Sequence, residues 1–335
     1  MTDWRDDLDR GQRERLRRTR MPAWTRPMLA TLTDKRFSSP EWIFERKLDG
    51  ERCLVFRRKS RLHILSRNRQ DLNATYPELV EALAEQSPGH FIVDGEIVAF
   101  DGNTTSFSRL QGRLGIKQPE EARASGIKVW LYLFDLLYLD RYDTTGLALR
   151  TRKQLLRRQF DFGDPLRFTA HHNANGTHWY RRACRRGWEG LIAKRADSPY
   201  LHSRSRHWLK FKCVNRQELV IGGYTDPGGS RTGFGALLLG YYENGTLRYA
   251  GKVGTGFDRA TLQDLGGKLA SLERKSCPYA GTPDVAGGGV HWVKPELVAE
   301  IGFTEWTNDK RLRHPRFLGL RHDKAPRKVV REAPQ

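Results

Sequence analysis

One short charged run constrains the fold of this chain more than any other stretch: Glu45-Arg46-Lys47-Leu48-Asp49-Gly50-Glu51-Arg52. It lies between two apolar segments that are typical of strands, Trp42-Ile43-Phe44 and Cys53-Leu54-Val55-Phe56. An Asp-Gly pair in this setting predicts a β-hairpin or another tight strand-to-strand bend. A lysine held at such a bend, beside carboxylates and an arginine, could be activated as a nucleophile. Taken alone, a charged hairpin tip is the simpler interpretation.

The charge balance indicates the kind of partner. Lys and Arg number 59 against 39 for Asp and Glu, which gives a formal net charge of +20. An excess this large favours a polyanionic partner, and arginine, which outnumbers lysine here, has a planar fork suited to phosphate. No uninterrupted apolar stretch approaches the eighteen or so residues of a membrane span, so such a span is excluded. Nucleic acid is therefore the expected partner.

The domain organisation changes near Asn215. Before it, strands alternate with helices such as the one expected over 151–160. After it, glycine is dense and the expected strands are short, with one helix over 259–271, which favours a small β-barrel such as an OB-fold. We expect an α+β protein with a basic arm at 1–22, one domain at 23–214, and a second at 215–335 that ends in a basic tail. The arm is either a short helix or flexible, and either a solvated tail or a phosphate-binding segment.

Cysteine usage indicates the compartment. The four cysteines, Cys53, Cys184, Cys213 and Cys277, are widely spaced and lack a Cys-x-x-Cys pair. This pattern predicts neither a zinc site nor a disulfide framework, so we expect a reduced cytoplasmic protein. The charged start of the chain, from Asp3 onward, has no apolar segment of the kind found in secretory signals.

Several strands of the first domain carry charge at alternate positions, where burial would cost several kcal/mol per ion without a partner or a use. Each pair alone is explained by a solvent-facing strand side. Together they predict that one sheet surface presents charge into a polar cleft between packed sheets. Such a cleft, with cations and a few carboxylates, suits a nucleoside triphosphate and a divalent metal. The charged positions are Glu45 and Lys47, Asp94 and Glu96, Lys210 and Lys212, with Glu189 and Lys194.

The order of these motifs resembles that of the covalent nucleotidyltransferases, specifically ATP-dependent DNA ligases of the bacterial ligase D type that act in end joining. The resemblance extends from about Met21 to Arg331. The matching segments, in order, are Lys47 to Arg52, Ser66-Arg67-Asn68, Asp94-Gly95-Glu96, Phe134-Asp135-Leu136-Leu137-Tyr138, Glu189 to Lys194, Trp208 to Lys212, Leu312-Arg313-His314-Pro315 and Arg321-His322-Asp323-Lys324.

This resemblance implies a nucleotidyltransferase (ATP-grasp-like) domain of antiparallel sheets with flanking helices, followed by a β-barrel OB-fold domain. It also implies that Lys47 attacks the α-phosphate of ATP, that AMP then passes to the 5′-phosphate of a nick, and that the 3′-hydroxyl displaces it. Lys210 and Lys212 would hold the α-phosphate, and their positive charge, together with that of a metal, would lower the pKa of Lys47.

The resemblance implies further roles, residue by residue. Glu45 would meet the adenine amino edge, Arg52 and Arg67 the ribose or phosphate, and Glu96 the ribose, while Phe134 would stack on the base. Glu189 and Glu96 would hold Mg²⁺ or Mn²⁺. In the second domain Arg321, Asp323 and Lys324 would close over the cleft and orient pyrophosphate, which requires a hinge near 213–217. Asp49 either shapes the turn or also touches the metal.

The implied partners are nicked double-stranded DNA, Ku and other end-joining proteins, with the protein itself a monomer at the nucleoid. Two alternatives stay open. An RNA ligase or a capping guanylyltransferase would use the same lysine chemistry, although Arg321-x-Asp323-Lys324 and Gly222-Gly223-Tyr224 favour a DNA ligase. A non-catalytic module could bind strands through its basic surface and OB-fold alone.

Overall fold

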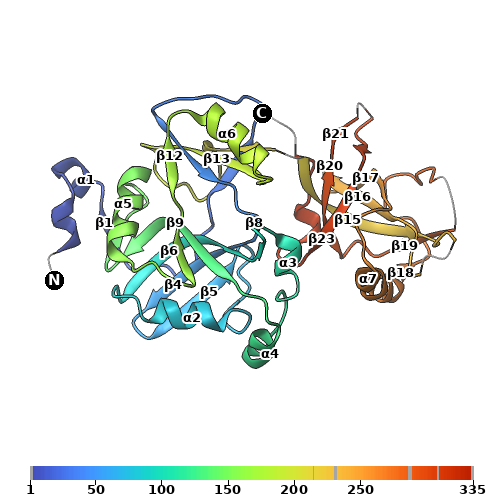
Figure 1. Cartoon of the computed structure of the whole chain (residues 1–335), viewed down its shortest axis with the longest axis horizontal. Helices are drawn as coiled ribbons and strands as arrows, with labels where there is room; N and C mark the ends of the chain where they lie inside the picture. Colours follow the sequence, from blue (N-terminus) through green and yellow to red (C-terminus); the bar gives the residue numbers. More distant parts are fainter. Residues whose placement is uncertain (1–2, 214, 230–231, 286–288, 308, 333–335) are drawn as a thin grey trace. The chain divides into compact units, whose positions relative to one another are not determined.

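The computed structural model describes residues 3–213, 215–229, 232–285, 289–307 and 309–332 (Figure 1). Over the described residues, packing divides the chain into two compact units, one up to Cys213 and one from Asn215 to Glu332. Residues 1–2 of the expected arm, residue 214 at the expected boundary and residues 333–335 of the expected tail lie outside the described residues. Each unit has its own hydrophobic core.

The first unit is built on two sheets whose pairs are antiparallel except for β11 with β9 and β2 with β14. The seven-stranded sheet has the order β1 (Arg17–Arg18), β10 (Tyr142–Asp143), β9 (Trp130–Leu139), β6 (His90–Val98), β4 (Glu51–Arg58), β5 (Arg61–Ser66), with β11 (Leu166–Phe168) beside β9. The five-stranded sheet has the order β12 (His171–Asn173), β3 (Trp42–Arg46), β13 (Gly190–Arg195), β14 (Arg204–Lys212), β2 (Leu29–Leu32). A short pair, β7 (Phe100–Asp101) and β8 (Thr104–Thr105), stands apart.

Strand alternation sorts the apolar side chains of this unit into layers. On β4, Cys53 and Val55 join the large core beneath the helices, whereas Leu54 and Phe56 join a second core that also contains Trp208 of the other sheet. A third cluster packs the far face of the five-stranded sheet against α6. The helical segments are η1 (Trp4–Asp7), α1 (Arg10–Glu14), α2 (Pro77–Ala84), α3 (Phe107–Leu110), α4 (Pro119–Ala124), α5 (Leu149–Gln159) and α6 (Gly176–Arg185).

Of the two arrangements predicted for Lys47, the hairpin is wrong, and the structure has the strand-to-strand bend. Strands β3 and β4 belong to different sheets, so the bend carries the chain from one sheet to the other. Gly50 is required by close approach, since a Cβ there would lie 2.1 Å from the Ile97 carbonyl oxygen. The Asp49 carboxylate accepts a hydrogen bond from the Phe107 amide at 3.3 Å, and its own amide donates to Thr105 Oγ1 at 3.1 Å. Asp49 thus anchors the crossing to the segment around α3.

The crossing also corrects the expectation of one charged sheet surface. Glu45, Lys210 and Lys212 are on the five-stranded sheet, whereas Asp94 and Glu96 are on the seven-stranded sheet. Two facing sheets therefore supply the charges, because the chain crosses between them at Lys47.

The start of the chain is folded against the first unit. Trp4 is buried, and its Nε1 donates to Asp140 Oδ2 at 2.7 Å. Arg17 and Arg18 pair in antiparallel register with Asp143 and Tyr142. Of the two interpretations of this segment, the structure has the short helix, α1, followed by a short strand.

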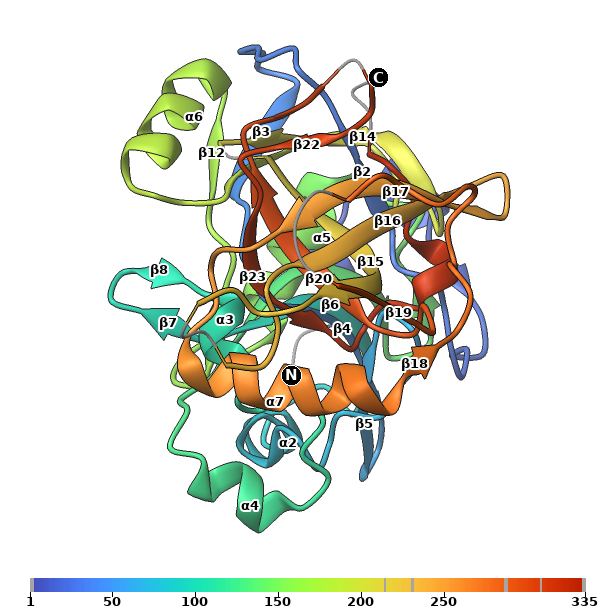
Figure 2. The same ribbon diagram turned by 90° about the vertical axis from the view of Figure 1, so that its right-hand side faces the viewer.

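The second unit is an open sheet with one long helix (Figure 2). Its order is β17 (Thr246–Val253), β16 (Leu237–Glu243), β15 (Asn215–Thr225), β19 (Val290–Val293), β18 (Glu273–Arg274), and β20 (Val298–Phe303) lies between β15 and β23 (Arg316–Arg321). Helix α7 (Arg259–Ser271) packs Leu262, Leu265 and Leu269 into the core. Short elements are β21 (Glu305–Trp306), β22 (Leu312–Arg313) and η2 (Pro326–Lys328). Within the described residues β17 and β23 do not pair, so the expected barrel is not closed.

The expectation of four unpaired cysteines is wrong for two of them. Cys184 of α6 and Cys213, just after β14, form a disulfide, while Cys53 and Cys277 are free. The pair is 29 residues apart in sequence, and the packing of α6 on the five-stranded sheet brings the two Cα atoms to 5.2 Å. In the part of the chain that is described, no helix has the length and apolar character needed to cross a membrane.

Candidate active site

Lys47 lies at the junction of the two sheets and forms an ion pair with Glu189. Its Nζ is 2.6 Å from Glu189 Oε2, and its amide donates to the Gly190 carbonyl at 3.0 Å. The Lys47 side chain is 19% exposed and that of Glu189 is 5% exposed. Burial acts to lower the pKa of Lys47, but the charges of Glu189, Asp49 and Glu96 outweigh burial and raise it. The expectation that neighbouring cations lower this pKa is therefore wrong for the protein by itself.

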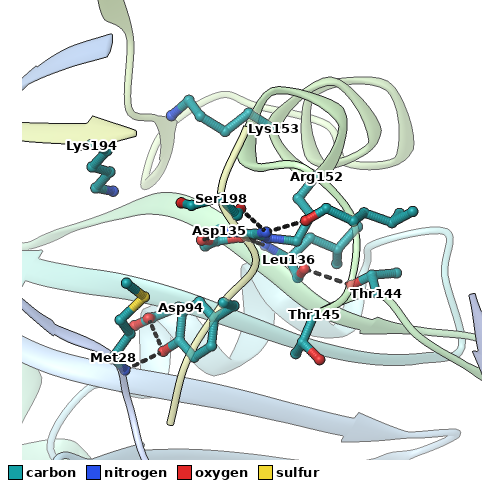
Figure 3. Close-up of polar contacts among 12 residues, drawn as sticks. Met28, Asp94, Asp135, Leu136, Thr144, Thr145, Arg152, Lys153, Lys194 and Ser198 are labelled. Atoms are coloured by element: carbon teal, nitrogen blue, oxygen red, sulfur yellow. Dashed lines mark hydrogen bonds and ion pairs between the residues drawn. The ribbon is translucent and has the colours of Figure 1, made fainter. Parts of the chain in front are cut away.

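Glu45, two residues before Lys47, binds two other lysines. Lys153 Nζ lies 2.5 Å from Glu45 Oε1 and Lys194 Nζ lies 2.6 Å from Glu45 Oε2, with all three side chains at most 3% exposed. Burial acts to raise the pKa of Glu45, but the two ammonium groups hold it below its usual value. Figure 3 shows Lys153 entering from α5 and Lys194 from β13. His171 lies opposite Glu45 on the neighbouring strand β12.

Arg52 forms a bidentate pair with Asp94 on the adjacent strand. Its Nε and Nη2 lie 2.5 and 2.6 Å from the two carboxylate oxygens of Asp94, which is fully buried. Tyr200 Oη also donates to Asp94, at 2.6 Å. The guanidinium lies 4.5 Å from the ring centre of Phe134, and Lys194 Nζ lies 4.2 Å from it. Phe134 is therefore a buried ring in contact with two cations that lie between the five-stranded and the seven-stranded sheet. We call this space between the two sheets the interlayer.

The remaining predicted residues of the first unit also lie along this interlayer. On β14, Lys210 and Lys212 are on the same side as Trp208, whose ring belongs to the core between the sheets, because strand side chains alternate. Glu96 pairs in register with Arg52 on β4 and contributes to the raised pKa of Lys47. Arg67 is half-buried, and its amide donates to the Arg52 carbonyl at 3.2 Å.

The three predicted residues of the second unit form their own ion-pair network. Arg321 binds both oxygens of Asp323, at 2.8 and 2.7 Å, and its Nη1 lies 3.4 Å from Glu300 Oε2. Lys324 Nζ lies 3.0 Å from Glu218 Oε2. Burial acts to raise the pKa of Glu218, but Lys324 and Arg321 hold it well below its usual value. This motif is thus held rigidly within its own unit.

The donor set near Lys47 fits a divalent metal that is shared with phosphate. Glu189 and Glu96 are close enough to Lys47 to raise its pKa. Among the residues described, no group of three or more His, Cys, Asp or Glu side chains is arranged to hold a metal ion. Mg²⁺ in nucleotide enzymes is usually bound by one or two carboxylates together with substrate phosphates and waters. The residues present therefore fit Mg²⁺ or Mn²⁺ held jointly with a nucleotide.

Sequence reasoning missed two buried cations that complete the interlayer. Lys153 lies in the helix expected over 151–160, where no role was predicted for it, yet it pairs with Glu45. Its neighbour Arg152 pairs with Asp135, both fully buried, and also donates to the Ser198 carbonyl at 3.0 Å (Figure 3). A signal was present, because a carboxylate in a buried apolar strand needs a cation from elsewhere. The sequence alone does not say which of its many cations supplies it.

Comparisons with known proteins match the chain to one family. Residues 27–212 match the family model of the ATP dependent DNA ligase domain, and residues 230–324 match that of the ATP dependent DNA ligase C terminal region. The multifunctional non-homologous end joining protein LigD of Pseudomonas aeruginosa is 39% identical over 325 residues, which are 95% of this chain and 38% of that protein. LigD of Mycobacterium tuberculosis strain H37Rv is 40% identical over 314 residues, 91% of this chain and 40% of that protein.

A solved structure, a mycobacterial DNA ligase D complexed with ATP and MES, superposes with a TM-score of 0.66 at 36% identity and covers 92% of this chain and 98% of that one. The chain spans about two-fifths of the length of the curated relatives named above. The predicted nucleotidyltransferase domain followed by an OB-fold-like domain is confirmed, and so is the resemblance drawn from the order of motifs. With the two family models together spanning most of its length, this chain belongs to the ATP-dependent DNA ligase family.

Proposed function

We propose that this chain seals nicks or breaks in double-stranded DNA, using ATP and a covalent lysyl-AMP intermediate, in DNA repair by end joining. The observation that carries the proposal is Lys47, placed at the junction of two sheets and paired with Glu189 at 2.6 Å. Lys210 and Lys212 lie on the same interlayer and offer positive charge for phosphates. Membership of the ATP-dependent DNA ligase family supports the same reaction class.

In the first step the Lys47 nitrogen attacks the α-phosphorus of ATP. A nitrogen–phosphorus bond forms, the bond between the α-phosphorus and the bridging oxygen breaks, and pyrophosphate leaves. The attacking nitrogen must be neutral, so one proton leaves Lys47 before or during attack. Glu189 and its neighbouring carboxylates hold the ammonium form until the phosphates arrive. Lys210 and Lys212 then stabilise the charge that develops on the phosphate oxygens.

In the second step a 5′-phosphate oxygen at the nick attacks the same phosphorus, and the lysine nitrogen leaves. The 3′-hydroxyl oxygen then attacks the 5′-phosphate, a phosphodiester bond forms, and AMP leaves. Glu189 and Glu96 are the residues that would hold Mg²⁺ or Mn²⁺, which supplies positive charge beside the phosphates when bound.

The nucleotide contacts are proposed from the same layer. Each oxygen of Glu45 accepts one ammonium hydrogen bond and keeps a lone pair for the adenine amino group. Phe134 is the ring proposed to stack on the base, with Arg52, Arg67 and Glu96 toward the ribose or phosphate. In the second unit, Arg321, Asp323 and Lys324 are proposed to orient pyrophosphate. This role requires the second unit to close over the cleft about a hinge at 213–217.

The decisive experiment is adenylation without DNA. The protein is incubated with α-labelled ATP and Mg²⁺ and separated under denaturing conditions. Wild type is expected to carry covalent label that is absent from Lys47→Ala. Lys47→Arg serves as the matched control, because arginine keeps the charge beside Glu189 but stays protonated and is no nucleophile. Label that survives in either variant refutes Lys47 as the acceptor.

Nicked substrates then identify the acceptor strand. Labelled protein is offered nicked duplex DNA or nicked duplex RNA, and sealing is followed on a gel. We expect DNA to discharge the label and be sealed. Sealing of RNA alone would make the chain an RNA ligase, and label from GTP rather than ATP would make it a guanylyltransferase. Association with Ku and other end-joining proteins, as a monomer at the nucleoid in the cytoplasm, is part of the proposal. A pull-down with DNA ends and host Ku that retains nothing contradicts the Ku contact.

A further inference from the structure

A basic cavity of about 790 Å³ lies in the first unit, apart from the residues of the candidate active site. It is formed where the N-terminal segment crosses the tips of two strand pairs, β4–β5 and β9–β10. Five cations and one carboxylate line it: Arg18, Arg20, Arg58, Lys59, Arg141 and Asp140.

The charge of this cavity is not neutralised by the protein. Over the described part of the chain, none of the five cations forms an ion pair, and all five are exposed. The single carboxylate, Asp140, already accepts a hydrogen bond from the Trp4 indole at 2.7 Å. A concave surface with this charge attracts a polyanion and concentrates it from solution.

The N-terminal segment is held in place by its backbone, so its cations are pre-positioned. The Thr19 amide donates to the Arg141 carbonyl at 3.0 Å, and Tyr138 Oη donates to the Thr19 carbonyl at 2.8 Å. Arg58 Nη2 donates to the Met21 carbonyl at 2.7 Å. A segment whose backbone is already ordered loses less loop freedom when its cations bind a phosphate.

Lys59 occupies a backbone position that favours glycine. It is the first of two turn residues between the paired Arg58 and Arg61, and its φ is 56°. This left-handed conformation is uncommon for a residue with a side chain. Strained positions of this kind point to a use for the side chain they carry. The exposed ammonium of Lys59 at the cavity offers such a use.

Strand β4 connects the cavity to the candidate active site, so the distance between the two follows from the length of the strand. Arg52 of the candidate site and Arg58 of the cavity are six positions apart on this strand, a span of about 20 Å at 3.3–3.4 Å per residue. Duplex DNA rises about 3.4 Å per base pair, so the same span corresponds to about six base pairs.

We propose that this cavity binds the phosphodiester backbone of the duplex flanking the nick, about six base pairs from the sealed bond. The inference rests on the proposed function, since it takes nicked DNA as the substrate. It adds a contact outside the nucleotide site, made by the N-terminal segment together with the β4–β5 and β9–β10 tips. Contacts of this kind go to phosphate and are independent of base sequence.

Lys59→Gly is the sharpest variant, because glycine suits the left-handed turn while it removes the Lys59 side chain and its charge. Binding of nicked duplex is measured by fluorescence anisotropy over a series of salt concentrations. We expect several-fold weaker binding and a slope of log affinity against log salt that is smaller by about one. The melting temperature is expected to stay equal to wild type or to rise. Lys117→Gln, which removes one exposed charge in the loop between α3 and α4, is the matched control and is expected to keep the wild-type slope.

Flank length gives a second readout. On nicked duplexes with one flank at a time shortened below about six base pairs, we expect the difference between wild type and Lys59→Gly to disappear for one of the two flanks. Wild-type affinity and slope in Lys59→Gly, or a difference that persists whichever flank is shortened, would overturn the inference.

Adenylation by ATP without DNA separates this inference from the proposed function. Lys59→Gly is expected to adenylate at the wild-type rate, since Lys59 lies outside the nucleotide site. Failure of wild type to adenylate refutes the proposed function. Normal adenylation with unaltered DNA binding in Lys59→Gly refutes only the proposed binding of DNA by the cavity.

Discussion

Two carboxylates near the Lys47 bend, Glu45 and Glu189, differ in what surrounds them. Glu45 holds two lysines, Lys153 and Lys194, and every member of this group is at most 3% exposed. Glu189 pairs with Lys47, whose side chain is 19% exposed. The first group is a network closed to solvent, and the second contains a partly exposed lysine that a substrate can reach. A buried pair serves positioning, and an accessible one can react.

The difference comes from the neighbours of each group. Lys194 Nζ lies 4.1 Å from the ring centre of Trp208 and 4.2 Å from that of Phe134, so aromatic rings cover it. Lys47 lies instead at the chain crossing, where β3 has ended and β4 has not begun. We infer that the group around Glu45 holds the adenine base rigidly. The pair of Lys47 and Glu189 remains open for phosphate chemistry.

Breaking the closed network should have the largest effect on stability. Lys153→Met leaves Glu45 buried with one ammonium group instead of two, which we expect to lower the free energy of unfolding by about 3 kcal/mol. The matched control is Lys128→Met, which removes an exposed pair with Asp164 and should cost less than about 1 kcal/mol. Denaturant unfolding measures both. Equal losses in the two variants would contradict the distinction.

The disulfide between Cys184 and Cys213 should contribute a similar amount to the free energy of unfolding. It joins Cys184 to Cys213, one residue after Lys212, and closes a loop of 29 residues. Removing such a constraint typically costs about 2–4 kcal/mol. Unfolding curves with and without a dithiol reductant should differ by this amount in wild type and coincide in Cys184→Ser. Cys277→Ser, which removes a free thiol, should keep the reductant-dependent difference.

Breaking the open pair should affect activity more than stability. Glu189→Gln removes the charge that holds the Lys47 nitrogen, and small misplacements of a reacting group cost about a hundredfold in rate. We expect adenylation to slow by at least that factor, while the free energy of unfolding falls by less than it does in Lys153→Met. Single-turnover labelling and denaturant unfolding give the two values. A large loss of stability with adenylation intact would contradict the assignment of the Lys47–Glu189 pair to reaction rather than to positioning.

The smallest expected effect is a pH dependence at His171, opposite Glu45. Burial, and then the charge of Lys153, lowers the pKa of His171 to about 4. Between pH 6.5 and 4 the unfolded chain binds this proton and the folded protein does not, so the contribution is complete above pH 6.5 and lost as pH falls to 4. Because the ring is partly exposed, we expect a loss of about 1 kcal/mol. Between pH 6.5 and 4, the free energy of unfolding of wild type should fall by this much more than that of His171→Gln. Parallel curves of the free energy of unfolding against pH would exclude a contribution from His171.

Sequence reasoning succeeded where a local pattern carried the information. Helix α7 was predicted with its observed bounds, because Asp258 caps it and its leucines recur on one face. The strands carrying Lys47's neighbours were found from alternating polarity. The hairpin was wrong because Asp-Gly was interpreted as a turn, whereas Gly50 is needed for close approach to Ile97. The disulfide was missed because α6 and β14 meet only in the folded chain.

The sequence by itself determined the ligase family, the two-part organisation and the residue types of the site, because these depend on motifs, their order and local periodicity. Only the tertiary structure decided which charges meet. It placed Lys153 on Glu45, Glu189 on Lys47 and the N-terminal segment beside Arg58 and Lys59. A buried carboxylate needs a cation, but the one that reaches it is selected by how sheets and helices pack. The Lys47 bend thus proved to be a crossing between two sheets, set by contacts far apart in the chain.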